Sequence, residues 1–318
     1  MKYKYKEFLF DPASRRIINE ITEFKPSKEL FKKITLTHWG KPVYDLSYLY
    51  AIKDGVEAKL DEEKMEFSMA LNKANKPIYH PFQAEEIING FINGLSKDQI
   101  EIFSQLDNNN VPLFDSIEMG RLSCFIEYAN DKQIKQLKEC ISEGIGYYQF
   151  ETFMFTDVSA ENMRIYKTLY LLDCGRNFIQ NLVKNELNYS ELKEVKYLVQ
   201  CADELLDENS KYKDMNIVTG PDSIVDILRE ALTREVGEKY NLKFEIRDII
   251  EKCLINKISS VEIESVINAE LSQADMLSAL NMVLEDNGVY DLNITINPYN
   301  NNMQTYIATD RSSDEPEL

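Results

Sequence analysis

One segment of this chain recurs at a fixed spacing, and this repetition constrains the fold more than any other feature. Residues 79–103, YHPFQAEEIINGFINGLSKDQIEIF, return 35 positions earlier as residues 44–68 and, in part, 35 positions later as residues 114–126. A fixed period of this length is the signature of proteins built from stacked repeats. The residues that coincide after the shift include Tyr79 with Tyr44, Ile87 with Ile52, Gly90 with Gly55, Leu95 with Leu60, Glu101 with Glu66, and Phe114 with Tyr79.

Each repeat predicts a helical hairpin. Apolar residues within 87–95 have helical spacing, which favours an amphipathic helix that begins near Phe82. Gly94 follows the last turn of this helix, where a residue of left-handed conformation best ends it. Ser96 and Gln99 then form a capping box, which is the pattern that starts a second helix.

The same pattern returns with one inserted residue at 244–266. There Asn256 takes the place of Gly94, and Ser259 with Glu262 rebuilds the capping box. A single helical hairpin cannot bury its own apolar stripe, so successive hairpins must stack. We therefore predict a mainly α fold, an α-solenoid of stacked helical hairpins.

A small β element is predicted from the two ends of the chain. The N-terminal KYKYKEFLF alternates as a half-buried strand does, and DLNITI and MQTYIAT alternate around NPYNNN as a β-hairpin does. We expect both to join one sheet. The predicted segments are 1–43 with the N-terminal strand and short helices, 44–146 with the helical repeats, 147–240 with central helices and an aromatic junction, 241–288 with degenerate helical repeats, 289–309 with the β-hairpin, and 310–318 as a disordered tail.

Composition narrows the class of protein. Of the 318 residues 44% are hydrophobic, which is enough for a large core, and no apolar run approaches the length of a membrane span. We therefore expect a soluble, cytoplasmic protein that does not bind a membrane. The five cysteines are odd in number and widely separated, which favours buried reduced thiols over disulfides or a zinc site.

Charge is distributed unevenly. Residues 1–60 hold twelve Lys and Arg against eight Asp and Glu, and the whole chain carries −18, so residues 61–318 carry −22. Such a field repels a nucleic-acid backbone, which argues against direct binding of nucleic acid. It suits instead a protein partner with a basic surface, such as a nucleic-acid-binding complex, although acidity can also serve solubility alone. The oligomeric state is not indicated by the sequence.

No catalytic or cofactor motif is recognisable. The phosphate-binding, zinc-protease and nucleophile-elbow patterns are missing, and the two histidines, His38 and His80, lie far from each other and from cysteine. Carboxylates are abundant, but on helices they are usually solvated. We predict no catalytic residue, cofactor or metal, and a carboxylate-based enzyme stays as an alternative.

The repeat resembles a known type of sequence. Its Q-(A/M)-x-E-I-x-x-G-(F/L)-x-x-G-L-(S/D) rhythm is similar to short helical repeats in proteins of phages and conjugative elements of Gram-positive bacteria. The resemblance implies a helical scaffold and a mobile-element setting, and it implies no catalytic residue. It is carried by Gln83, Ile87, Gly90, Phe91, Gly94, Leu95 and Ser96, with Phe114, Asp115, Ser116 and Met119 at the start of the next copy.

Two functions of different classes follow as hypotheses. The first is a non-catalytic interaction module, in the form of an antagonist or adaptor whose acidic helices act on a host defence nuclease or another basic complex. The second is a regulator that senses a ligand or peptide through the aromatic junction at 147–155, YYQFETFMF, which can equally be a core-filling junction. The residues predicted to contact a partner are Glu85, Glu86 and Glu118 in the repeats, and Tyr147, Tyr148, Phe150 and Phe153 at the junction.

Overall fold

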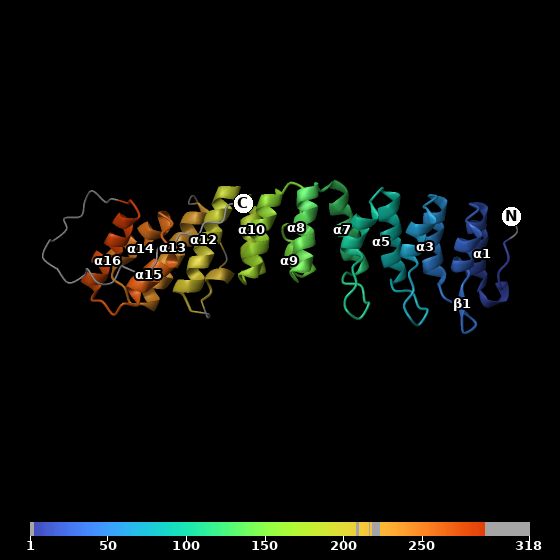
Figure 1. The fold of residues 1–318 in the computed structure, drawn as a ribbon, viewed down its shortest axis with the longest axis horizontal. Coiled ribbons are helices and arrows are strands. Elements are labelled where there is room, and N and C mark those ends of the chain that lie inside the picture. Colours follow the sequence, from blue (N-terminus) through green and yellow to red (C-terminus); the bar gives the residue numbers. More distant parts are fainter. Residues whose placement is uncertain (1–2, 208–209, 216, 218–222, 290–318) are drawn as a thin grey trace. The chain divides into compact units, whose positions relative to one another are not determined.

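The computed structural model describes residues 3–207, 210–215, 217 and 223–289, which are mainly helical (Figure 1). The chain divides into two compact units, one of residues 1–202 and 208–228 and the other of 203–207 and 229–318. The first unit holds η1 (Glu7–Leu9), α1 (Pro12–Glu23), α2 (Lys28–Ile34), β1 (Thr37–His38), β2 (Lys41–Pro42), α3 (Leu46–Glu57), α4 (Glu62–Ser68), α5 (Pro81–Ile92), α6 (Lys97–Phe103), α7 (Ser116–Tyr128), α8 (Asp131–Ser142), α9 (Tyr147–Phe150), α10 (Ala160–Leu171), α11 (Arg176–Lys184) and η2 (Tyr212–Asp214). Helices α12 (Tyr189–Leu205) and α13 (Ile224–Lys239) run through both units, and α14 (Phe244–Ile255), α15 (Ser260–Ile267) and α16 (Gln273–Asp286) belong to the second.

The helical hairpin predicted from the repeat is present, and its first helix keeps a constant length. Its first helix has 12 residues in α1, α3, α5, α8, α10 and α14. After each of these helices one residue has positive φ, and the second residue after that is the N-cap of the next helix. In the copy at 80–103 the backbone N–H of Leu95 donates to the carbonyl oxygen of Gly90 at 3.0 Å across Gly94 (φ 93°), which closes the helix end. The positive-φ residues of the six copies are Lys25, Lys59, Gly94, Gly144, Asp173 and Lys257.

The two helices of a hairpin approach closely where the first helix carries glycine. A Cβ atom built on Gly90 would lie 2.5 Å from the Cδ1 atom of Ile100, and one built on Gly55 would lie 2.6 Å from the Sδ atom of Met65. Both partner side chains are fully buried. The glycine that recurs at this position of the repeat is therefore explained by contact between the helices.

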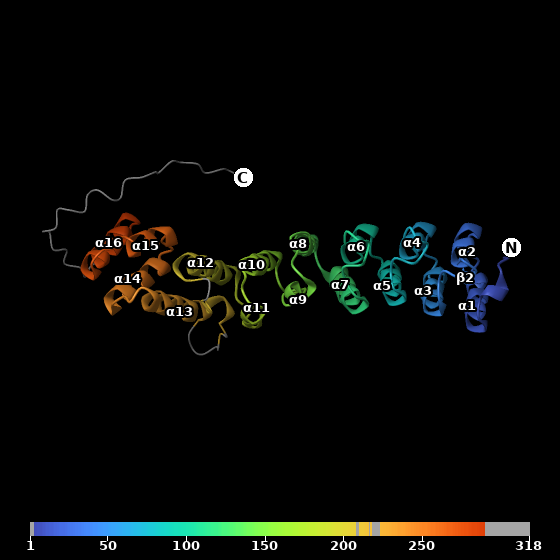
Figure 2. The same cartoon turned by 90° about the horizontal axis from the view of Figure 1, so that it is seen from below.

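Successive hairpins of the first unit pack side by side. Helix α1 contacts α3, α3 contacts α5, and α5 contacts α7. Figure 2 shows these four helices in one row, while α2, α4 and α6 form a second row. The buried stripe residues Ile52, Ile87 and Leu122 face this packing, with none of their surface exposed. Burial of such side chains removes apolar area from water, which is the main favourable term in folding.

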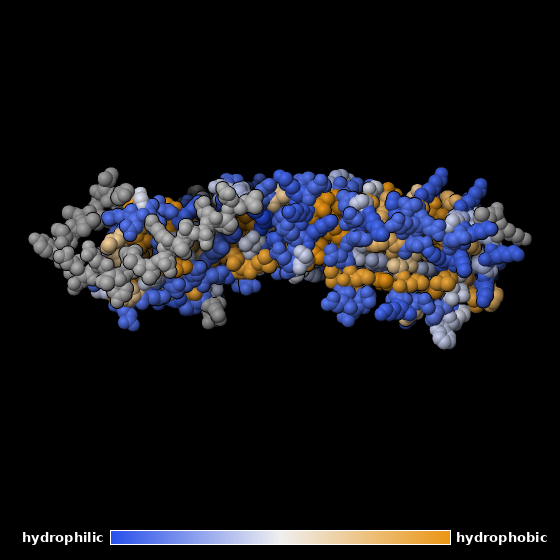
Figure 3. Space-filling view, in the orientation of Figure 1, coloured by the Kyte–Doolittle hydropathy of each residue, from blue (hydrophilic) through white to orange (hydrophobic). Residues whose placement is uncertain are grey.

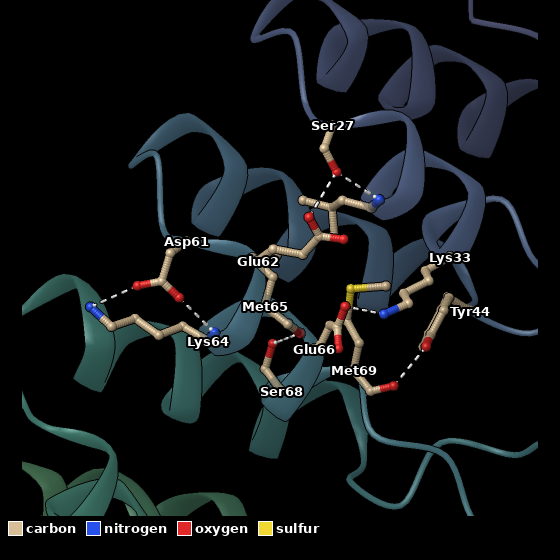
Figure 4. Close-up of polar contacts among 11 residues, drawn as sticks. Ser27, Lys33, Tyr44, Asp61, Glu62, Lys64, Met65, Glu66, Ser68 and Met69 are labelled. Carbon is tan, nitrogen blue, oxygen red and sulfur yellow. Dashed lines mark hydrogen bonds and ion pairs between the residues drawn. The ribbon is translucent and has the colours of Figure 1, made fainter.

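Polar side chains also join neighbouring hairpins. Ser27, the N-cap of α2, donates to Glu62 of α4 at 3.1 Å, and Lys33 of α2 forms an ion pair with Glu66 of α4 (Figure 4). Lys97 of α6 continues the series with Glu63 of α4 at 3.0 Å. These pairs are exposed, so they fix the register of the hairpins more than they stabilise them.

The repeat changes after α7. Helix α7 begins 35 residues after α5, but it is followed directly by Asn130, the N-cap of α8. Helix α8 then acts as the first helix of a new hairpin with α9, and it packs against α10. Helix α8 begins where the second helix of this repeat is expected, but it has 12 residues in place of the 7 of α6, and α9 follows it, so the spacing of 35 is lost there.

The second unit repeats the hairpin in α14 and α15, which both pack against α16. Gln273 of α16 accepts the backbone N–H of Lys243 at 2.9 Å and donates to the carbonyl oxygen of Asn241 at 3.2 Å. Lys239 donates to the carbonyl oxygen of Leu205 and pairs with Asp207, both at 3.1 Å.

The predicted N-terminal strand is wrong. Residues 3–6 have no regular structure and η1 follows, while the tyrosine rings fold back over the first hairpin. The ring of Tyr3 packs on Phe31 with centroids 4.6 Å apart, and its hydroxyl donates to the carbonyl oxygen of Pro26 at 2.6 Å. The alternation of tyrosine and lysine thus reflects a segment that packs on the first hairpin, not a strand. Most of the predicted hairpin at 289–309 lies outside the described residues.

Ser259 is the N-cap residue of α15, as predicted, but the predicted capping box is wrong, because the Ser259 side chain forms no capping hydrogen bond. At Ser96 the predicted capping box is confirmed: Ser96 accepts the N–H of Gln99 at 3.3 Å, and Gln99 accepts the N–H of Ser96 at 2.9 Å. All five cysteines are free thiols, and only Cys124 is exposed. Within the described part of the chain, no helix has the length and apolarity needed to cross a membrane.

Candidate interaction surface

The predicted acidic residues lie on two helices that pack against each other. Glu85 and Glu86 belong to α5 and Glu118 to the first turn of α7, and all three are half-buried. Glu118 accepts the backbone N–H of Asp115 at 2.9 Å and so completes the capping box of α7. Its position is therefore fixed by the start of the helix.

Glu86 occupies a notch left by a glycine of the neighbouring helix. A Cβ atom built on Gly120 of α7 would lie 3.0 Å from the Oε2 atom of Glu86, so only glycine leaves room for this carboxylate. Burial raises the pKa of Glu86, and the negative charge of Glu85 raises it further. Among the described residues no hydrogen bond or cation balances this carboxylate. A cationic group from outside would therefore find an uncompensated negative charge here.

The aromatic junction belongs to the core. Tyr147 is 6%, Phe150 1% and Phe153 0% exposed. Their rings pack against each other and against neighbouring helices, for example Tyr147 on Phe150 with centroids 5.5 Å apart, and Phe153 on Tyr166 at 5.7 Å. Of the four predicted aromatic residues Tyr148 alone is exposed. The hypothesis of a ligand pocket needs these rings to be accessible, so their burial gives it no support.

The histidines lie in different local settings. His38 is in β1, and His80 is the residue before α5, where its backbone N–H donates to Gln83 at 2.7 Å. In the portion of the chain that the structure describes, no group of three or more His, Cys, Asp or Glu side chains has an arrangement that could hold a metal ion.

A small pocket lies between α4, α5 and α6, but its charges are already paired. Two lysines and two phenylalanines line it together with Asp61 and Glu63. Lys64 pairs with Asp61 at 3.5 Å, and Lys97 pairs with Glu63 at 3.0 Å. The ammonium groups also lie over the rings, at 5.8 Å from the centroid of Phe91 and 5.9 Å from that of Phe67. The side chains that line this pocket therefore link neighbouring hairpins through their ion pairs.

Three similar loops project from one edge of the first unit. They connect α2 to α3, α4 to α5 and α6 to α7, and Figure 1 shows them side by side. We define the loop edge as residues 36–43, 70–78 and 105–113. Each loop is closed by an antiparallel pair, Thr37 with Pro42, Leu71 with Pro77, and Leu106 with Pro112.

The second and third loops share one backbone conformation, and the first loop shares with them a residue of positive φ. Gly40, Asn75 and Asn110 all have positive φ, at 74°, 55° and 60°. Asn72 and Asp107 accept backbone N–H groups from residues two and four positions later, as in an Asx turn. The prolines at 42, 77 and 112 share the period of 35, and this signal in the sequence could have revealed the loops.

Apolar side chains follow the base of these loops. Figure 3 shows an apolar strip along the lower edge of α3, α5 and α7, just above the loops. The loops and the first turns of the helices supply exposed apolar residues there: Val111 is 55%, Leu113 45%, Ile117 68% and Phe82 56% exposed. Trp39, in the first loop, is 89% exposed. An exposed apolar strip of this kind marks an interaction site more often than a solvated surface.

Comparison of the chain with protein-family models, with curated proteins and with solved structures finds no match.

Proposed function

We propose that this protein is an α-solenoid that acts as a non-catalytic protein-interaction module. The constant length of the first helix in each hairpin and the sequential packing of α1, α3, α5 and α7 support an array in which each repeat offers the same kind of surface. Such arrays bind macromolecules along extended faces, because neighbouring repeats place side chains at regular intervals.

The partner that we propose has a basic surface. Residues 61–318 have a net charge of −22, and the whole chain has a net charge of −18. The observation that carries this proposal is the unbalanced, half-buried carboxylate of Glu86 between α5 and α7. Glu85 precedes it in α5, and Glu118 lies on the packed helix α7. An arginine or lysine from a partner would relieve the cost of that charge.

The resemblance to repeats of phage and conjugative-element proteins suggests the setting. In that setting the chain would be a cytoplasmic antagonist or adaptor that acts on a host nuclease or another nucleic-acid-binding complex. Its acidic helices would occupy the channel that normally holds the nucleic acid.

Affinity capture with charge-matched variants tests this proposal. The variant E85Q/E86Q/E118Q removes three negative charges and keeps the capping hydrogen bond at position 118, because glutamine also accepts it. The control D98N/E101Q/D131N removes three exposed charges from α6 and α8. We expect a basic protein to be captured from a Gram-positive bacterial lysate by the wild type and the control but not by the first variant. Equal capture by both variants, or capture of acidic proteins only, would refute the proposed surface.

A further inference from the structure

The first loop of the loop edge exposes the single tryptophan of the chain in an unusual conformation. Trp39 has a φ of 52°, in the left-handed region that a bulky residue rarely adopts. Its ring centroid lies 5.6 Å from that of His38, and 89% of the residue is exposed to solvent. A strained, exposed tryptophan contributes little to the fold, and tryptophan is the residue type most enriched at binding hot spots.

The loop edge also differs in charge from the rest of the chain. Lys41, Lys73 and Lys76 are exposed in the first two loops, and no ion pair among the described residues holds any of them. The third loop carries Asp107, whose Oδ1 atom accepts the backbone N–H groups of Asn109 and Val111, both at 2.8 Å, so the excess of positive charge belongs to the first two loops. A basic rim thus borders the apolar strip in a protein of net charge −18.

We propose that the loop edge is a second docking surface, which binds an acidic amphipathic helix of a partner protein. The three unpaired lysines select acidic flanks on that helix, and the strip with Trp39 receives its apolar side chains. The spacing also fits: packed helices such as α3, α5 and α7 lie about 8–10 Å apart. Two turns of a partner helix, about seven residues, span about 11 Å, so side chains seven residues apart would contact successive repeats. This surface is separate from the acidic surface at Glu85, Glu86 and Glu118, and it would make the protein an adaptor.

The fluorescence of Trp39 reports directly on this surface, because the chain has no other tryptophan. The probe is a synthetic helical peptide without tryptophan that carries leucine at every seventh position between glutamates. We expect a blue shift of the emission on titration, since binding transfers the indole from water to an apolar contact. A peptide with lysine in place of glutamate should give no shift, and anionic phosphatidylserine vesicles should give none.

Two pairs of variants separate binding from folding. Binding is followed by anisotropy of the labelled peptide, which does not depend on the tryptophan. We expect W39A and K73E/K76E each to weaken binding at least tenfold. The controls Y128A, which removes another exposed aromatic ring, and K135E/K138E, which reverses two exposed charges on α8, should bind as the wild type does.

The variant E85Q/E86Q/E118Q should also bind the acidic peptide normally, so that failure of the acidic surface and failure of the loop edge can be told apart. The proposal is overturned if the acidic peptide leaves the emission unchanged, if the lysine peptide binds equally well, or if vesicles alone shift the emission.

Discussion

At the scale of single residues, the repeat is maintained by close contacts that only small side chains allow. Gly90 lies against Ile100 and Phe103, both fully buried, while Gly94 lies in open space and is needed only for its φ of 93°. The two glycines are four residues apart, yet they are fixed by different physical causes. The first depends on packing and the second on backbone conformation.

We predict that G90A destabilises the protein by about 1–3 kcal/mol through overpacking. G94A should cost about 1 kcal/mol through backbone strain alone. The double variant G90A/I100V should recover part of the first loss, because it shortens the side chain that the new methyl group meets. Urea unfolding measures all three free energies, and a G90A protein as stable as the wild type would contradict the observed packing.

A buried lysine supplies a second residue-scale prediction. Lys167 of α10 has 9% of its side chain exposed, and it donates to Glu139 at 2.9 Å and to Glu143 at 2.8 Å, both on α8 or at its end. The hydrogen bond from Lys167 lowers the pKa of Glu139 below its ordinary value of 4.5. Ionised Glu139 therefore stabilises the fold above pH 4.5, and this contribution is lost as the pH falls through the lower folded-state value.

We expect K167M to cost about 2 kcal/mol at pH 7, between the values typical of exposed and buried ion pairs. The difference from the wild type should shrink as the pH falls below 4.5, because the abandoned carboxylates become neutral. Urea unfolding at pH 7 and at pH 3.5 measures this. A deficit that does not change with pH would exclude the ion pair as its cause.

At the scale of elements, the hairpin is defined by where its helices start and stop. Ser96 and Asp61 cap their helices through side-chain hydrogen bonds, at 3.3 and 2.9 Å, whereas Ser259 does not. We therefore predict that S96A costs about 1 kcal/mol and that S259A costs close to zero. Urea melts of the two variants test this difference. An equal loss in both would mean that the Ser259 side chain does cap α15.

Much of this element-scale structure could be predicted from the sequence, because periodicity and caps are local signals. The sequence predicts the hairpins at 44–68, 79–103 and 244–266, with helix starts near Phe82, at Ser96 and at Ser259. The recurrence of the projecting loops was not predicted, although the prolines at 42, 77 and 112 share the period of 35. The backbone hydrogen bonds of an Asx turn such as that of Asn72 are not visible in the sequence. The burial of Tyr147 and Phe153 could not be decided either, since an aromatic cluster suits a core and a binding site equally.

At the scale of the whole molecule, the segment before α1 covers an apolar part of the first hairpin. Residues 3–10 cover Phe31 through the rings of Tyr3 and Tyr5, whose centroids lie 4.6 and 5.9 Å from it. A terminal repeat without such cover would expose its apolar face to water. The sequence suggested a strand here because alternation is also the pattern of a half-buried extended segment.

Deletion of residues 1–10 should loosen the nearest hairpin. We expect faster amide exchange in α1 and α2, and unchanged exchange in α14 to α16, because the effect of a lost cap spreads through neighbouring repeats only. Hydrogen exchange followed by mass spectrometry measures this. Unchanged exchange in α1 and α2 would show that the N-terminal segment is not a structural cap.

The central claim is that this array binds a basic partner through the acidic surface of α5 and α7, and the association rate measures it most directly. With the captured partner immobilised, the rate should fall about tenfold or more as salt reduces the Debye length from ~10 Å to ~3 Å. E85Q/E86Q/E118Q should associate about tenfold more slowly than the wild type at low salt, and the control D98N/E101Q/D131N should not differ from it. An association rate that is insensitive to salt and equal in the two variants would contradict the account.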